Sequence, residues 1–172
     1  MTEQLKGVEA PDHRGRFITA MRSVAGTVAV VTTNGPAGKH GATVSAFCSV
    51  SADPPSLLVC LHSQSRIAEL VRQNKNFSVN VLPQSLDHVA DRFAGKDDAK
   101  ISDRFDGIDC FDGTNNCPGI NRSITFECDL ASDMLSGSHW VIVGNVSHIC
   151  GQIDKPLTYL NGAYYPWIGY PD

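Results

Sequence analysis

The pattern of hydrophobic and polar positions along this chain is mostly that of β-strands. Short runs rich in Val, Ile, Thr and Phe alternate with polar or proline-containing segments such as NGPAGKH and ADPP. Runs of this kind are typical of strands joined by tight turns. They predict six strands, over residues 25–33, 41–51, 56–62, 77–82, 123–133 and 139–150.

Three segments follow a helical period instead. Apolar residues recur three and four positions apart over 11–23, 65–73 and 85–93, which predicts three short helices. Residues 95–121 are rich in Asp, Gly and Asn and predict a long surface loop close to a site. Because strands and helices do not alternate regularly, a mainly β, six-stranded antiparallel barrel is favoured over a doubly wound sheet.

Composition and charge narrow the function classes. The 172 residues fit one domain, and a net charge of -4 with dispersed Lys and Arg argues against a nucleic-acid partner. No run reaches the length of a membrane span, and residues 1–7 are too polar for a secretory signal, so a cytoplasmic protein without a membrane partner is expected. There is no GxGxxG or GxxxxGK[ST] motif to support a Rossmann or P-loop site.

The cysteines and histidines predict no metal site. Four of the six cysteines lie in apolar, strand-like runs, where buried reduced thiols are common. Cys110 and Cys117 are further apart than the cysteines of zinc hairpins, and the histidines at 40, 62, 139 and 148 form no pair with ligand spacing on a helix.

Residues 41–55, GATVSAFCSVSADPP, carry the strongest indication of a ligand. Small and hydroxylated residues crowd a strand in which bulky residues are usual. A flat ring with carbonyl and nitrogen edges, such as an isoalloxazine, needs close main-chain groups and a few hydroxyls of this kind. The alternative is a barrel strand whose small residues face a crowded interior.

The segment 63–66, SQSR, lies between a predicted strand and a predicted helix. Free N–H groups at a helix N-terminus, two hydroxyls and a guanidinium form a phosphate site of the kind that the tail of FMN requires. The alternative is an ordinary serine N-cap followed by a solvated arginine.

Several motifs in a fixed order connect the chain to a known family. TNGPAGKHGATVSAFCSVSADPPSLLVCL is followed by HSQSR, NFSVNVL, DRFAG and GSHWVIVGNV. From residue 17 to residue 165 the chain resembles the split-barrel NAD(P)H:flavin reductases that serve two-component monooxygenases. The resemblance implies an FMN-binding split barrel, a homodimer, FMN or FAD as the flavin, NADH or NADPH as the hydride donor, and a separate oxygenase as partner.

The resemblance also implies roles for individual residues. His139 would lie beside the nicotinamide as the catalytic residue, and the main chain around 45–47 would stabilise the reduced flavin. The flavin ring and ribityl chain would be lined by Thr43, Ser45, Ala46, Phe47, Ser49, Val50 and Ser51. The phosphate would be bound by Ser63, Ser65 and Arg66, and a turn beside the flavin would be formed by Arg92, Phe93, Ala94 and Gly95. Tyr164 would supply an aromatic ring.

This chain departs from the common family pattern at several of these positions. Ser138 stands where Asp is common before the histidine, which bears on the orientation of His139. Ser63 and Ile67 stand where a basic residue and Thr are frequent, and this bears on the phosphate assignment. Ser45 and Cys48 replace an Asn and a Thr.

Three functions are compatible with the sequence. The first is a flavin reductase that supplies reduced flavin to a monooxygenase. The second is an FMN-containing reductase of the same fold that passes electrons to a corrinoid, a haem or an iron complex, because a fold does not fix a function. The third is a flavin-binding protein without turnover.

Overall fold

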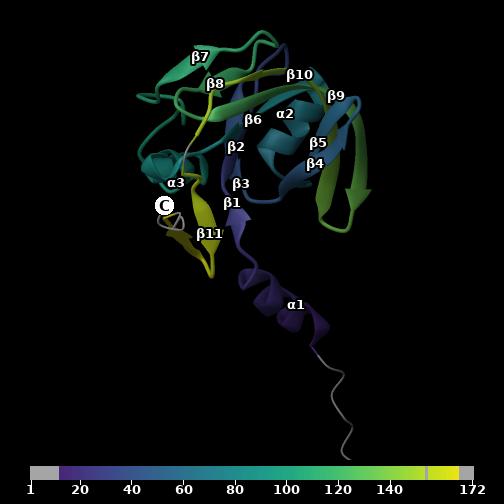
Figure 1. The fold of residues 1–172 in the computed structure, drawn as a ribbon, viewed down its shortest axis with the longest axis vertical. Coiled ribbons are helices and arrows are strands. Elements are labelled where there is room, and N and C mark those ends of the chain that lie inside the picture. Colours follow the sequence, from purple (N-terminus) through teal and green to yellow (C-terminus); the bar gives the residue numbers. More distant parts are fainter. Residues whose placement is uncertain (1–11, 154, 167–172) are drawn as a thin grey trace, which may run out of the picture.

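The computed structural model describes residues 12–153 and 155–166 of the chain. Its main element is a seven-stranded sheet in which every neighbouring pair of strands is antiparallel, in the order β3–β2–β6–β9–β10–β5–β4 (Figure 1). The mainly β class predicted from the sequence is therefore confirmed. The strands are β2 (Ala29–Thr33), β3 (His40–Val44), β4 (Phe47–Ala52), β5 (Pro55–His62), β6 (Asn76–Val81), β9 (Ile124–Ser136) and β10 (His139–Cys150).

The strand expected over 41–51 is wrong as a single element, because the structure divides it into β3 and β4. β3 pairs with β2 up to Val44, whereas β4 begins at Phe47 on a different partner, β5. Ser45 and Ala46 lie between the two ladders, and the Ala46 carbonyl accepts a hydrogen bond from the Cys60 N–H at 2.9 Å. The two edge strands of the sheet are thus consecutive in the chain, and this division gives seven strands instead of six.

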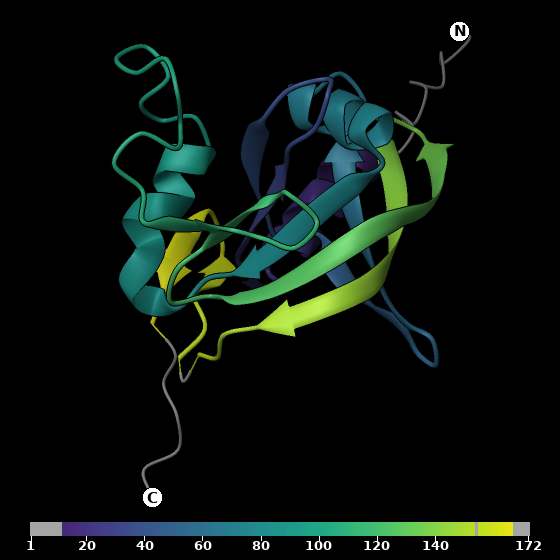
Figure 2. The ribbon, with the colours of Figure 1, turned by 90° about the horizontal axis from the view of Figure 1, so that it is seen from above.

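Helix α2 (Arg66–Asn74) packs in the curve of the sheet, as Figures 1 and 2 show. It buries Ile67, Ala68, Leu70 and Val71. The sheet side of this core includes the fully buried side chains of Val59, Phe77, Val79 and Ile142. The helix expected over 65–73 and its inner face are therefore confirmed.

A second core lies beside the sheet, under α3 (Asp87–Phe93) and the short 3-10 helix η1 (Gln84–Leu86). Next to it are elements that the hydrophobic pattern did not predict. They are β11 (Thr158–Leu160) and β12 (Ala163–Tyr165), which form a three-stranded sheet with β1 (Gly26–Thr27), and the hairpin of β7 (Cys110–Asp112) and β8 (Pro118–Ile120). β1 itself lies within the strand expected over 25–33, which is wrong as a single element because the structure divides it into β1 and β2 in different sheets. The hairpin lies within the loop expected over 95–121.

Helix α1 (His13–Arg22) projects from the rest of the molecule (Figure 1). It begins at Asp12, whose carboxylate accepts a hydrogen bond from the Gly15 N–H at 2.8 Å. A helix is confirmed within the expected range 11–23, with Asp12 and Ser23 as its caps, while residue 11 lies outside the described residues. None of the α1 residues is buried, and the side chains of Phe17 and Met21 are 66% and 49% exposed. Within the described ranges, no helix is both long and apolar enough to cross a membrane.

Candidate functional site

Three cavities meet at the break between β3 and β4, and Ser45 lines all of them. Their volumes are about 720, 270 and 200 Å³. Ser45 and Ala46 are exposed and belong to neither ladder, so their N–H groups are not committed to the sheet. These two residues therefore do not face a crowded barrel interior, and a ligand against their main chain stays a prediction.

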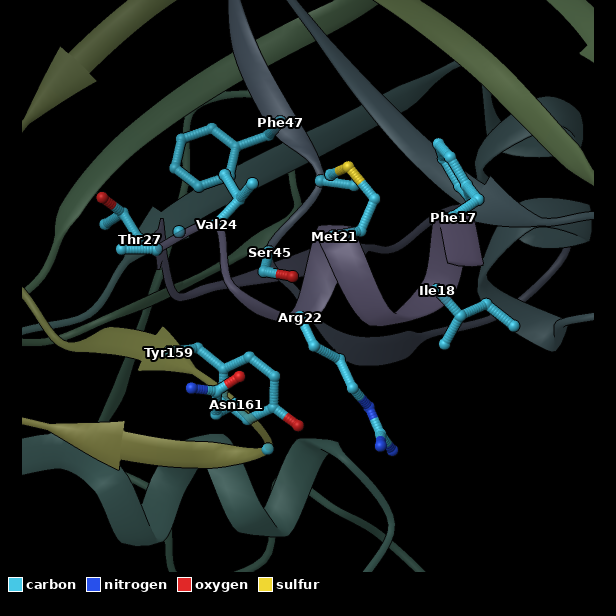
Figure 3. Close-up of a pocket in the computed structure, with 14 residues that line it drawn as sticks. Phe17, Ile18, Met21, Arg22, Val24, Thr27, Ser45, Phe47, Tyr159 and Asn161 are labelled. Atoms are coloured by element: carbon cyan, nitrogen blue, oxygen red, sulfur yellow. The ribbon is translucent and has the colours of Figure 1, made fainter. Parts of the chain in front are cut away.

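The largest cavity lies between the β3–β4 break and α1 (Figure 3). Phe17, Ile18 and Met21 of α1 form one wall, and Phe47 and Tyr159 lie across from them. This apolar, half-open space is large enough for a flat aromatic ring system.

The second cavity contains His139, the predicted catalytic residue, together with His62, Cys60 and Ser65. His139 begins β10 and pairs with His62 of β5, and their rings meet edge to face with centroids 5.3 Å apart. The Ser138 hydroxyl lies 3.0 Å from Nδ1 of His139. Ser138 therefore occupies the orienting position beside the imidazole in this chain, and His139 is exposed at the rim.

The third cavity contains Tyr164 and Ala94 from the predicted set, together with Thr43. The Thr43 hydroxyl donates to the Ala90 carbonyl of α3 at 2.6 Å, so this hydroxyl also holds α3 on the sheet. Burial and the neighbouring Asp91 raise the pKa of Tyr164 to about 12.

The predicted phosphate residues begin at the second cavity. Ser65 is the N-cap of α2: its hydroxyl accepts from the Ala68 N–H at 3.4 Å and donates to the His62 carbonyl at 2.6 Å. The N-cap interpretation of Ser65 is thus confirmed. Ser63 is half-buried, and its N–H donates to the Ser138 carbonyl at 2.9 Å.

Arg66 lines a fourth cavity, of about 420 Å³, that is rich in positive charge. Lys39, His40 and Arg104 line it as well. Burial, followed by the charges of Arg104 and Arg66, lowers the pKa of His40 to about 4. An anion bound here would relieve the repulsion among these groups, which makes the cavity suited to a phosphate.

Two carboxylates compete for these cations in the structure. Asp98 forms an ion pair with Arg104 at 2.6 Å, and Asp103 forms one with Lys39 at 3.4 Å. The sequence analysis missed Lys39, His40 and Arg104, because Arg104 lies in the segment 95–121 and meets β3 only through the fold. The adjacent basic pair at 39–40 was the signal that could have been noticed.

Four predicted residues form the C-terminal end of α3 and its turn. Phe93 is 1% exposed and packs edge to face on Phe105, so it supports the site from inside the core and does not line it. Nη1 of Arg92 donates to the Asp106 carbonyl at 3.1 Å, and Gly95 has a positive φ of 88° at the turn. Ala94 is the member of this group that lines a cavity beside Ser45.

Ser49, Val50 and Ser51 lie on β4, where they are exposed. They are not part of the linings of the three cavities around Ser45. The Ser51 hydroxyl accepts a hydrogen bond from the Asp53 N–H at 3.0 Å in the turn to β5. Their role toward a ligand stays a prediction.

Comparison with known proteins agrees with this geometry. The profile of the family described as "Flavin reductase like domain" matches residues 21–167. The chain is 31% identical over 160 residues to the FMN reductase (NADH) RutF of Pantoea ananatis (strain LMG 20103), covering 92% of this chain and 83% of that protein.

Two solved structures share the fold. Nitrilotriacetate monooxygenase component B from Mycobacterium thermoresistibile is 26% identical, with a TM-score of 0.83 and coverage of 96% of this chain and 93% of that one. BorF, the flavin reductase component of a bacterial two-component tryptophan halogenase, is 26% identical, with a TM-score of 0.82 and coverage of 91% and 99%. The predicted split-barrel fold and the family resemblance are confirmed.

Proposed function

This chain belongs to the family of flavin reductase-like domains, and from that premise we propose how its residues carry out flavin reduction. The chain is an NAD(P)H:flavin oxidoreductase that reduces FMN, with FAD as a second possible flavin, and supplies reduced flavin to a separate oxygenase. Residues 1–172 form one such domain in this proposal.

The observation that carries the assignment of the flavin site is the convergence of three cavities on the main chain at Ser45. Ser65 lines one of them, and the next residue, Arg66, lines the fourth, basic cavity. FMN has the matching parts: a flat ring with hydrogen-bonding edges and a phosphate. The residues present fit the group, because Ser45 and Ala46 leave the main chain accessible and Arg66 supplies a charge for the phosphate.

Bound flavin supplies the chemistry by accepting a hydride from the nicotinamide. The chain has to position the two reactants and exclude water. The N–H groups of residues 45–47 are placed to stabilise the negative charge of the reduced ring. His139, oriented by the Ser138 hydroxyl, holds the nicotinamide carboxamide at the rim of the second cavity.

We further propose that a second copy of the chain completes the site. The apolar face of α1 is exposed at Phe17 and Met21, Val24 just after the helix is exposed as well, and all three line the largest cavity. An exposed apolar helix face that borders a ligand cavity is what an obligate interface leaves when one subunit is removed. Light scattering should give twice 18.5 kDa, and a stable monomer would refute this part of the proposal.

The cytoplasm is the compartment we propose for this enzyme. All six cysteines are unpaired, although Cys48 is exposed and Cys60, Cys110 and Cys150 are half-buried. Accessible thiols persist where glutathione and thioredoxin keep them reduced.

A steady-state assay tests the function. Purified protein is given NADH or NADPH with excess FMN or FAD in air, and nicotinamide oxidation is followed over many turnovers. Multiple turnovers with free flavin support the flavin reductase. A single turnover that becomes catalytic only with a corrinoid, haem or iron acceptor would indicate the second function, and flavin binding without nicotinamide oxidation would indicate the third.

A further inference from the structure

Three side chains that differ in chemistry meet at the end of the sheet opposite His139. Glu127 of β9 lies directly opposite His148 of β10, and Cys150 follows two residues later on β10. Residues paired in this way, and residues two apart on one strand, project from the same face of a sheet. A carboxylate oxygen, an imidazole nitrogen and the thiol sulfur of these residues lie within 4.8 Å of one another.

Glu127 is a buried carboxylate without a cationic partner. It is 1% exposed, and no Lys, Arg or His nitrogen of the described residues lies within 4.0 Å of its oxygens. The hydrogen bonds that it accepts come from neutral groups, the Thr114 hydroxyl at 2.5 Å and the Asn115 N–H at 3.0 Å, and both reach Oε2. Burying an ionised carboxylate is costly unless a positive charge compensates it.

His148 and Cys150 lie on the open side of this carboxylate. His148 is exposed and Cys150 is half-buried, so an ion can reach the cluster from solvent. On binding a cation, the Cys150 thiol would release its proton to solvent.

We propose that Glu127, His148 and Cys150 form a zinc site with three protein ligands and a fourth position open to water. One sulfur, one nitrogen and one oxygen donor are the ligands of a borderline-soft ion such as Zn²⁺, whereas Mg²⁺ and Ca²⁺ prefer oxygen donors alone. Ligands of a tetrahedral Zn²⁺ ion lie about 3.3–3.7 Å apart, so ligand atoms within 4.8 Å of one another have to close by at most about 1.5 Å.

The cluster lies at the end of β10 that is far from the nicotinamide side of the site. His139 and Cys150 are the first and last residues of β10, so the cluster is roughly 30–35 Å along the strand from the nicotinamide side of the site. Thr114 and Asn115 belong to the turn of the β7–β8 hairpin, which covers Glu127. An ion here would tie β9 and β10 together under that hairpin. The proposal does not depend on the flavin site.

Linear spacing could not have indicated this site. The sequence analysis predicted no metal because neighbouring cysteines and histidines lack ligand spacing, but here two ligands come from one strand and the third from its partner across a hairpin. Their proximity depends on the β9–β10 register, including the shift between Val146 and His148.

The test is metal binding by the untagged, chelator-treated full-length protein, with Co²⁺ as the spectroscopic probe and Zn²⁺ as the competitor. One equivalent of Co²⁺ should bind with a thiolate-to-cobalt charge-transfer band, which Zn²⁺ abolishes. At a free Zn²⁺ concentration about 100-fold above Kd, Tm should rise by about 5–10 °C.

The variants assign the ligands. Cys150→Ser should remove the charge-transfer band, and both Cys150→Ser and His148→Ala should weaken Zn²⁺ binding at least tenfold. Cys110→Ser is the matched control, because Cys110 is also a half-buried strand cysteine and should leave the band and the affinity unchanged. Circular dichroism without metal verifies that each variant is folded.

Two results would overturn the proposal. One is a wild-type protein that gives no charge-transfer band and no rise in Tm with Zn²⁺. The other is a band that persists in Cys150→Ser or disappears in Cys110→Ser, because the ion would then be bound by a different thiol. Neither result depends on turnover of flavin.

Discussion

Arg66→Ala should separate the binding of the flavin phosphate from that of the flavin ring. Arg66 is the first residue of α2, lines the basic cavity, and lies close enough to His40 to lower its pKa. A charge-assisted contact contributes about 1.5–3 kcal/mol. Arg66 is exposed, so the lower end of that range applies, and 1.5 kcal/mol corresponds to roughly tenfold in Kd.

The assay is a fluorescence titration with FMN and with riboflavin, which has the same ring but no phosphate. Arg66→Ala should weaken FMN binding by roughly tenfold and leave the Kd of riboflavin nearly unchanged. Arg122→Ala is the control, because Arg122 is also exposed but bonds to Ser85 and lines none of the four cavities. Equal losses for both flavins, or an unchanged Kd for FMN, would remove Arg66 from the phosphate site.

Three further predictions concern the nicotinamide side, the basic cavity and the core. His139→Ala should lower kcat/KM for NADH by about tenfold, or roughly 1.4 kcal/mol, without changing flavin affinity; loss of the flavin with intact NADH kinetics would contradict its role. His40 takes up a proton below pH 6.5 in the unfolded chain but only below about pH 4 in the folded one, so the free energy of unfolding should fall as the pH drops through that window. In urea titrations, His40→Gln should lessen this fall in the free energy of unfolding by about 1 kcal/mol at pH 5, a value discounted for the partial exposure of His40. Identical pH profiles for the variant and the wild type would refute the assignment of the pH dependence to His40. Gly144→Ala should lower the free energy of unfolding by about 1–3 kcal/mol, because a Cβ there would lie 2.5 Å from the buried Phe77 ring and 2.8 Å from Cβ of Cys128. A urea midpoint close to that of the wild type would show that the core can adjust.

The local pattern of hydrophobic residues predicted the strands and helices that bury one face with regularly spaced apolar residues. The strand expected over 139–150 is β10 with the same bounds, and the helix expected over 65–73 is α2 within one residue. Both elements have an apolar face that packs into the core. The short strands β7, β8, β11 and β12 were missed, because three residues are too few to establish a period.

The break at Ser45 and Ala46 could not be predicted for a different reason. β-Propensity is continuous from residue 41 to residue 51, and the strand divides only because its two halves have different partners, β2 and β5. Tertiary pairing likewise brings Arg104 to His40 and Glu127 to His148. The sequence therefore indicated the segment that lines the three cavities at Ser45, but not the basic cavity or the cluster at the far end of β10.

At the break between β3 and β4, the requirements of ligand binding and of fold stability, which usually conflict, fall on different residues. A residue within a ladder serves both the fold and any ligand beside it, so substitutions that adjust binding often cost stability. Ser45 and Ala46 have no ladder partner, and both residues are exposed. In the proposed flavin site, substitutions at these two positions should therefore change flavin affinity with little change in the free energy of unfolding.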